Sequence, residues 1–383
     1  MINKNRLITL LQKLIRINSE NPDNNESEIA RFVKDYLGKL GVGSRIYEFA
    51  KNRSNIIAGL KGAGPRHSLL ITPHLDTVPA GKNWKFPPFS GQLHNGRIYG
   101  LGATDCKGNL AVSLETIHSL VEDKTILGYN LVFAATADEE SGSELGLIPL
   151  LDKGILKPDA AVVLDADDFE VVVAQKGLIH VKVKIKGKRA HGAYPYRGVN
   201  AIDQAVAILG ELKLRKPAYR KNKYLLPPTM NIGTIKGGDK VNVVADWCEF
   251  ELDFRFLPGM KPDAVLRGLK TVVNKYAGNF KIEIEGIQKD YYINAKHPLV
   301  NAISAALEKF RIKPNICGSE GATTITFFQD KSIPAIATGF GIEGCAHTVD
   351  EYAKINDLYK GALVLEQFLK NYTWIKGDDY GRD

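Results

Sequence analysis

Short apolar runs that each stop at a histidine or a carboxylate are the feature of this sequence that most limits its fold. Residues 68–72 lead to His74, residues 130–135 lead to Asp138-Glu139-Glu140, and residues 160–164 lead to Asp165. The alternation of such runs with helix-like segments predicts a largely parallel or mixed sheet that helices cover on both faces. In α/β folds, ligand-binding side chains gather just past the carboxyl ends of the strands. These side chains are therefore the first candidates for a functional site.

The pattern changes after Lys176-Gly177, where apolar and polar residues alternate strictly over 179–186. This alternation predicts a strand with one solvated face. This strand is the first of a predicted series of elements in the order β-α-β-β-α-β, which indicates a ferredoxin-like module. Because 383 residues are too many for one core, we predict two domains. The predicted fold class is α/β, with a mixed-sheet α/β/α catalytic domain at 1–176 and 293–383 and an inserted α+β domain at 177–292.

Composition narrows the class of protein. The four cysteines lie far apart without a C-x-x-C pair, which favours reduced thiols in a cytoplasmic protein. No segment approaches the roughly 20 apolar residues that a membrane span needs, so we expect no membrane partner. The formal net charge is +8. We find no tight cluster of Lys and Arg interleaved with aromatic residues, so we expect no nucleic-acid partner.

Histidines and carboxylates at the predicted strand ends are the ligand types that zinc-like ions use. His74 follows one strand, Asp105 closes a glycine-punctuated loop before a helix, and His347 lies near the end of the chain. Imidazole with carboxylate suits zinc, cobalt or manganese, and in a two-metal site one carboxylate normally bridges the ions. Asp76, two residues after His74, is placed to accept the second imidazole N–H.

Glu139 and Glu140 are adjacent, so one can ligate a metal while its neighbour accepts a proton from water. The residues alone leave open which glutamate does which. The predicted chemistry is the metal-assisted hydrolysis of an amide.

Simpler readings exist for each residue alone. Acidic residues in loops are usually solvated, and His74 alone is as readily a buried core histidine. Cys106 beside Asp105 suggests a thiol nucleophile, but no matching His–Asn arrangement is evident. The coincidence of ligand types at several independent strand ends favours the metal site.

Three motifs resemble those of the M20 family of metallohydrolases, and the resemblance runs from about Ile8 to Leu369. They are His74-Leu-Asp76-Thr-Val-Pro79, Gly96-Arg-Ile-Tyr-Gly-Leu-Gly102-Ala-Thr-Asp105, and Asp138-Glu139-Glu140-Ser-Gly. By position, the resemblance implies that His74 and Asp165 hold one metal and that Glu140 and His347 hold the other. It also implies that Asp105 bridges the two ions, that Glu139 is the base, and that Asp76 orients His74.

The inserted domain resembles the lid and dimerisation domain of this family. His191, in Lys188-Arg-Ala-His191, matches the histidine that reaches a neighbouring subunit's site and steadies the oxyanion. The sequence leaves open whether His191 acts within its own chain or across a dimer. Asn242 and Arg255 match lid residues that grip the substrate's carboxylate. Arg255 alternatively pairs with acidic residues on its own strand, such as Asp253. The resemblance predicts a homodimer that forms through this domain.

Two segments depart from the family pattern. Asp165-Ala166 stands where many relatives have Glu-Pro, and Asp167 and Asp168 lie close enough to permit a shift in register. Residues 318–323 differ from the loop that helps many deacylases choose their substrate, which leaves specificity open.

The resemblance therefore implies an amidohydrolase that uses two divalent metal ions, zinc first, with cobalt or manganese as alternatives. The first choice of substrate is an N-acyl amino acid of the acetylornithine or succinyl-diaminopimelate kind. The runner-up is a short peptide, which would make the protein a carboxypeptidase or dipeptidase. A rival from another class is a non-catalytic binding protein with the same fold.

Overall fold

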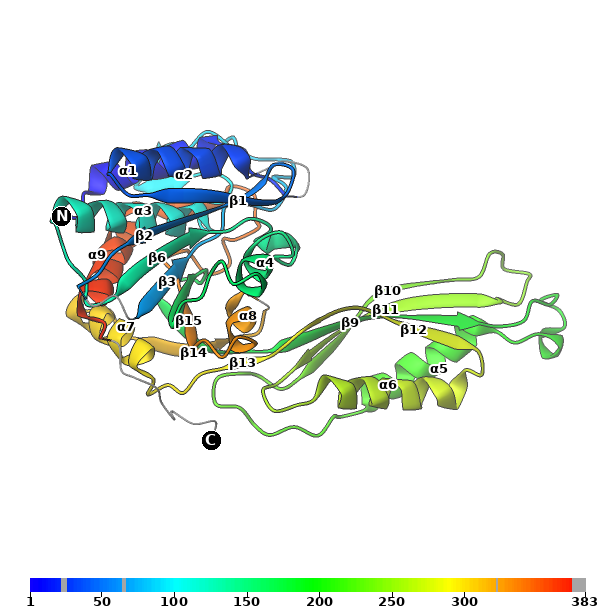
Figure 1. The fold of residues 1–383 in the computed structure, drawn as a ribbon. Helices are drawn as coiled ribbons and strands as arrows, with labels where there is room; N and C mark the ends of the chain where they lie inside the picture. Colours follow the sequence, from blue (N-terminus) through cyan, green and yellow to red (C-terminus); the bar gives the residue numbers. More distant parts are fainter. Residues whose placement is uncertain (22–25, 64–66, 322, 374–383) are drawn as a thin grey trace. The chain divides into compact units, whose positions relative to one another are not determined.

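The computed structural model describes residues 1–21, 26–63, 67–321 and 323–373 (Figure 1). The chain divides into two compact units. The first comprises the described residues of Met1–Val173, Ile293–Cys317 and Thr323–Asp383. The second comprises Ala174–Tyr292 together with residues 318–321, whereas the sequence predicts both 174–176 and 318–321 in the catalytic domain.

A large mixed sheet forms the centre of the first unit. Its strands, in spatial order, are β1 (Ser44–Ala50), β2 (Arg53–Leu60), β6 (Asn130–Ala135), β3 (Ser68–Thr72), β7 (Ala160–Leu164), β15 (Ala335–Thr338) and β8 (Glu170–Gln175), and β14 (Asn315–Ser319) also pairs with β8. β3 runs parallel to β6 and β7, and β15 runs parallel to β7. Parallel strands place their carboxyl ends at one edge, so the segments after β3, β6 and β7 meet there. The predicted α/β class with a mixed sheet is confirmed.

Helices pack against one another and against this sheet. They are α1 (Lys4–Arg16), α2 (Ser27–Lys39), α3 (Lys107–Glu122), α4 (Leu147–Asp152), α7 (Pro298–Lys309), α8 (Ile325–Gln329) and α9 (Ile355–Asn371). α3 lies between α1 and α9 and is buried on nearly all sides. Even Glu115 of α3 is fully buried, where it accepts hydrogen bonds from Arg6 of α1 at 2.7 and 2.8 Å. Within the described residues, no helix combines the length and apolar character of a membrane span.

Three short strands form a separate small sheet in the first unit. β4 (Gln92–His94) pairs with β5 (Arg97–Tyr99), which pairs with β16 (Tyr352–Lys354). Each strand has only three residues, too few for a period-two pattern, so the sequence did not predict them. The pairing of β5 with β16 brings residues near 351 beside the loop that follows β5.

The second unit is an antiparallel sheet with two helices on one face (Figure 1). Its elements are β9 (Gly177–Lys186), η2 (Pro195–Arg197), α5 (Ala201–Leu214), β10 (Thr229–Gly237), β11 (Trp247–Phe256), α6 (Pro262–Tyr276) and β12 (Phe280–Gln288), and the strand order is β10-β11-β9-β12. β13 (Tyr291–Tyr292) pairs with residues 174–175. Apolar side chains such as Val183 and Phe250 are buried in the core that α5 and α6 share. Lys182 and Lys184 alternate with them and form ion pairs with glutamates of β11 and β12.

The same substitution at two helical glycines should have opposite effects on stability. A Cβ at Gly361 in α9 would overlap the buried ring of Phe340, so Gly361→Ala should destabilise the protein by about 1–3 kcal/mol. Gly210 in α5 is exposed and has open space beside it, so Gly210→Ala should stabilise the protein by about 0.5–1 kcal/mol. Differential scanning calorimetry measures both effects. A higher melting temperature for Gly361→Ala would contradict this packing of α9.

Candidate metal centre

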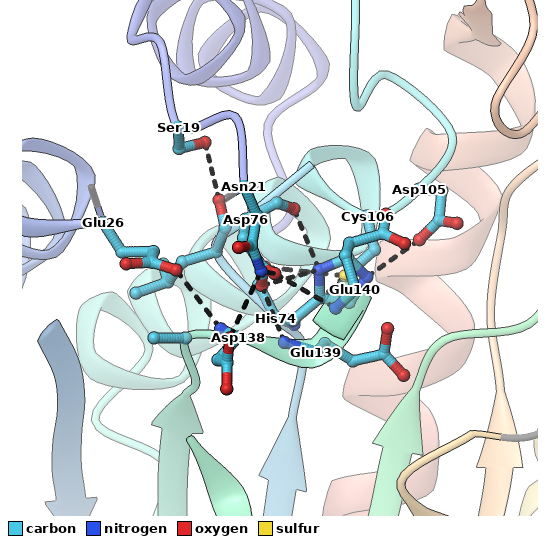
Figure 2. A network of polar contacts seen from close by, with 12 residues as sticks. Ser19, Asn21, Glu26, His74, Asp76, Asp105, Cys106, Asp138, Glu139 and Glu140 are labelled. Carbon is cyan, nitrogen blue, oxygen red and sulfur yellow. Dashed lines mark hydrogen bonds and ion pairs between the residues drawn. The ribbon is translucent and has the colours of Figure 1, made fainter. Parts of the chain in front are cut away.

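His74 lies just past the end of β3. Its backbone forms an isolated parallel β-bridge with Thr136, which follows β6. Its ring is buried, and Nδ1 lies 3.0 Å from the backbone carbonyl oxygen of Asp76 (Figure 2). Donation from Nδ1 to that carbonyl leaves Nε2 as the ligating nitrogen. Nε2 lies 2.8 Å from Oδ1 of Asp105 and 3.8 Å from Oδ1 of Asp165.

Asp105 lies between two imidazoles. Its Oδ1 faces His74, and its Oδ2 lies 3.2 Å from Nε2 of His347. Burial alone would raise the pKa of Asp105, but hydrogen bonds with His347 and His74 hold it well below its ordinary value. A carboxylate that presents each oxygen to a different imidazole has the arrangement expected of a bridging ligand.

Glu140 and His347 complete one side of the cluster. Nε2 of His347 lies 3.2 Å from the Glu140 carboxylate. Hydrogen bonds with Asp105 and Glu140 raise the pKa of His347 to about 10. The His347 side chain is 52% exposed, whereas that of Glu140 is 8% exposed, so this side of the cluster opens to solvent.

Glu139 and Asp165 lie on the side of His74. One ligand atom from each of the three residues lies within 4.8 Å of the others. Burial raises the pKa of Glu139 well above its ordinary value, and the negative charge of Asp165 adds to the effect. Burial and the charge of Asp105 likewise raise the pKa of Asp165 to about 7. Carboxylates this close and this buried need a positive charge to stay ionised together.

These residues fit divalent cations. Two groups of three, His74 with Glu139 and Asp165, and Asp105 with Glu140 and His347, each offer nitrogen and oxygen atoms within 4.8 Å of one another. Nitrogen and oxygen donors in such groups suit zinc, cobalt or manganese. Cys106 is also near His74, but it is fully buried and burial raises the pKa of its thiol to about 12. A thiol in that state is neither a nucleophile nor a ready metal ligand.

Asp76 orders the segment that carries the two glutamates. Its carboxylate accepts the backbone N–H groups of Glu139 and Glu140, both at 3.1 Å, and the amide N–H of Asn21 at 2.9 Å (Figure 2). The sequence predicts that this carboxylate orients His74. In the structure the Asp76 backbone carbonyl is the nearer partner of His74, because the carboxylate oxygen lies 3.5 Å from Nδ1.

A buried ion-pair network holds the residue before the glutamates. Arg53 donates to Glu26 at 2.7 Å and to Asp138 at 2.9 Å. Asp138 has a φ of 65°, a left-handed conformation that is uncommon outside glycine. Its other carboxylate oxygen accepts the N–H of Leu145 at 3.0 Å. The network therefore fixes the turn from which Glu139 and Glu140 project.

Glu351 holds the backbone of the loop that carries Asp105. The sequence did not predict this role for Glu351. This buried carboxylate accepts the backbone N–H groups of Gly102, Thr104 and Asp105 at 2.9, 2.8 and 3.0 Å. The signal available in the sequence was weak, namely one more acid four residues after His347.

Three predicted site residues belong to the second unit. His191 is exposed and forms a backbone bridge with Val243, and the neighbouring Gly192 N–H donates to the Asn242 carbonyl at 2.8 Å. Arg255 donates two hydrogen bonds to Asp253, at 2.7 and 2.8 Å, which is the pairing that the strand pattern also allowed. Their roles stay predictions.

The two departures from the family pattern have clear positions. Asp165 is the member of the segment 165–168 that contacts His74, whereas Asp168 accepts the backbone N–H of Glu343 at 3.3 Å. Residues 318–321 belong to the second unit, where Glu320 forms an ion pair with the buried Lys176 at 2.5 Å. Ala322 of that loop lies outside the described residues.

Comparison with known proteins identifies the family and agrees with the fold. The profile of peptidase family M20/M25/M40 matches residues 70–371. A tripeptidase from Staphylococcus aureus aligns with a TM-score of 0.81 and 26% identity, over 97% of this chain and 98% of that chain. The aminopeptidase PepT from Bacillus cereus aligns with a TM-score of 0.80 and 25% identity, over 96% of this chain and 98% of that chain. A dinuclear metal binding peptidase from Bacillus subtilis shares the fold, with a TM-score of 0.75 and 17% identity over 96% of this chain and 97% of its own.

We expect metal-free protein to bind two equivalents of Zn²⁺. His347→Ala should leave one, because the group of Asp105, Glu140 and His347 would lose its only nitrogen ligand. Isothermal titration calorimetry measures the stoichiometry. His94→Ala, at an exposed histidine outside the cluster, is the matched control and should still bind two. Two equivalents in His347→Ala would contradict the assignment.

Glu351→Ala should destabilise the protein by at least about 2 kcal/mol, because it leaves three buried N–H groups without their acceptor. It should also weaken Zn²⁺ binding, since the Asp105 loop loses its support. Glu351→Gln keeps one acceptor oxygen and should have an intermediate effect. Urea unfolding and Zn²⁺ titration measure the two changes.

Asp350→Asn is the control for Glu351. It changes the adjacent acid but keeps the oxygen that accepts the N–H groups of Lys85 and Phe86. Unchanged Zn²⁺ affinity in Glu351→Ala would show that Glu351 does not position Asp105.

Proposed function

The chain belongs to peptidase family M20/M25/M40, and on this premise we propose that it is a two-metal peptidase that acts on short peptides. Membership of this family shows that the protein is a hydrolase of amide or peptide bonds. The family does not support the rival hypothesis of a non-catalytic binding protein. The observation that carries the proposed mechanism is the position of Asp105 between two histidines, with Glu139 beside one of the two groups.

The proposed ligands are His74 and Asp165 for one ion and Glu140 and His347 for the other, with Asp105 shared because its two oxygens contact the two histidines. When bound, two such cations polarise the scissile carbonyl and lower the pKa of a water molecule. Zinc is our first choice because nitrogen and carboxylate donors are mixed, and cobalt or manganese would fit the same donors.

Glu139 is the proposed general base. Its neighbour Glu140 is engaged by His347 at 3.2 Å, whereas Glu139 lies with His74 and Asp165. This division leaves the Glu139 carboxylate to accept a proton from the attacking water. The same carboxylate then donates that proton to the leaving amine.

The proposed substrate is a tripeptide or another short peptide. Support comes from the Staphylococcus aureus tripeptidase and the Bacillus cereus aminopeptidase, which match nearly the whole of this chain at 26% and 25% identity. The deacylation of N-acyl amino acids, which was the first choice from sequence, stays a prediction. Both reactions hydrolyse an amide C–N bond, so the metal centre alone does not distinguish a peptidase from a deacylase.

The second unit is proposed to recognise the substrate and to form a homodimer. Asn242 and Arg255 are the proposed carboxylate-binding residues, and His191 is the proposed oxyanion-stabilising residue, contributed across the dimer. Exposed apolar side chains near His191 support an interface there, since Tyr196 is 76% exposed and Val241 is fully exposed. A cytoplasmic location also stays a prediction, which the four free thiols support.

Glu139→Gln should lower kcat by about 10²–10⁴-fold, because the amide cannot accept the proton from water. The variant should still bind two equivalents of Zn²⁺, since the proposed metal ligands are unchanged. Steady-state peptide hydrolysis and metal titration measure these two properties. Glu144→Gln, at an exposed glutamate outside the cluster, is the control and should keep full activity.

One substrate panel separates the candidate activities. It contains a tripeptide, a dipeptide, a peptide with a blocked amino terminus, N-acetylornithine and N-succinyl-diaminopimelate, each tested with Zn²⁺-, Co²⁺- and Mn²⁺-loaded protein. Cleavage of the unblocked tripeptide supports the proposal. Exclusive cleavage of an acyl amino acid would replace it with the deacylase reading. Full activity of Glu139→Gln would refute the proposed base.

A further inference from the structure

A cavity of about 1000 Å³ is lined only by residues of the second unit, and none of them is a proposed metal ligand. Residues from the end of α5 and the following loop, 212–220, form one side of the cavity. The start of β10, the end of β11, the loop 258–261 and the first half of α6 form the rest. The volume reaches the upper end of the range that is usual for small-molecule sites.

The lining is strongly basic. It includes six cationic side chains and no carboxylate, and the six are Lys213, Arg215, Lys216, Arg220, Arg255 and Lys261. Asp253 already engages Arg255, and Arg215 donates to the Gly268 carbonyl at 2.8 Å. Within the part of the chain that the structure describes, the other four form no ion pair. Their positive charges are therefore available to an anionic ligand.

Aromatic and apolar side chains share the lining with these cations. Tyr219 is 43% exposed, and Phe254, Met230, Met260 and Val265 provide further apolar surface. A flat ring can stack on such surfaces while its charged groups contact the lysines and arginines.

The basic segment corrects one expectation from the sequence. Residues 213–223 contain six lysines and arginines among eleven residues, with Tyr219 between them and Tyr224 directly after them. The expectation that the sequence contains no such cluster is wrong, whereas the absence of a nucleic-acid partner stays a prediction. The structure places the first four of the six cations on the cavity wall, whereas Lys221 and Lys223 do not line it.

We propose that this cavity binds a small molecule that carries an aromatic ring and several phosphate groups, such as a nucleoside triphosphate. Four unpaired cations exceed what the single carboxylate of a short peptide needs. Because the four cations line one cavity of about 1000 Å³, a compact ligand fits better than a long nucleic-acid strand. Arg255, proposed above as a substrate-binding residue, also lines this cavity, but it is already paired with Asp253 and is not counted among the four cations available to the ligand.

ATP is the probe for this site, and isothermal titration calorimetry of the full-length protein is the measurement. The protein is freed of metal with a chelator and carries His74→Ala, so that phosphate cannot bind through ions at the metal centre. Lys216→Glu and Arg220→Glu should each weaken ATP binding about tenfold, because each removes a charge-assisted contact. Both residues are exposed, and circular dichroism verifies that the variants fold.

Lys221→Glu is the matched control. It makes the same charge change one residue from Arg220, but outside the cavity lining, so binding should change by no more than about twofold at physiological salt. ATP should bind more tightly than AMP, because more phosphate groups contact the cations.

Three results would overturn the proposal. The first is that metal-free protein does not bind ATP at millimolar concentration. The second is that Lys221→Glu weakens binding as much as Arg220→Glu, which would indicate a diffuse surface charge. The third is that a single-stranded oligonucleotide binds more tightly than ATP, which would indicate a nucleic-acid partner. Because none of these measurements uses peptide hydrolysis, their failure is independent of the proposed peptidase activity.

Discussion

Negative charge gathered at the carboxyl edge of one sheet is the constraint on which the rest of the site depends. Asp105, Glu139, Glu140 and Asp165 meet around His74 and His347. Burial of like charges is unfavourable, and the raised pKa values of Glu139 and Asp165 express that cost. Divalent cations would relieve it, so the cluster is understandable as a binding site and is hard to explain as a means of stabilising the fold.

Buried groups that do not belong to the cluster hold its members in place. Asp76 fixes the backbone of Glu139 and Glu140, Glu351 fixes that of Asp105, and the Glu26–Arg53–Asp138 network fixes the turn before the glutamates. In each case a buried carboxylate accepts hydrogen bonds from backbone N–H groups or from an arginine. These hydrogen bonds offset the free-energy cost of burying its charge. The support crosses long sequence distances, since Glu351 lies 246 residues from Asp105. Such contacts pre-organise a metal site before any ion binds.

The second unit follows a different physical pattern. One face of its sheet is apolar and is covered by α5 and α6. The other face is charged and carries ion pairs such as Lys184–Glu283. Beyond this regular part, the loop after α5 brings unpaired cations to a cavity. Cations that form no ion pair contribute little to the folded state, so a role in binding explains them better than a role in stability.

Local pattern in the sequence was sufficient for much of this protein. Apolar runs that stop at His74, Glu139 and Asp165 predicted the parallel strands and their shared edge, because strand direction aligns their carboxyl ends. The strict alternation after Gly177 likewise predicted the antiparallel unit.

Tertiary structure alone decided which atoms meet. It placed the Asp76 carbonyl, not its carboxylate, nearest to His74, and it brought Glu351 to the Asp105 loop through pairing of three-residue strands. It also gathered the cations of 213–220 around a cavity. Periodicity reports which face of an element is buried, whereas contacts between distant segments depend on backbone paths that no local pattern encodes.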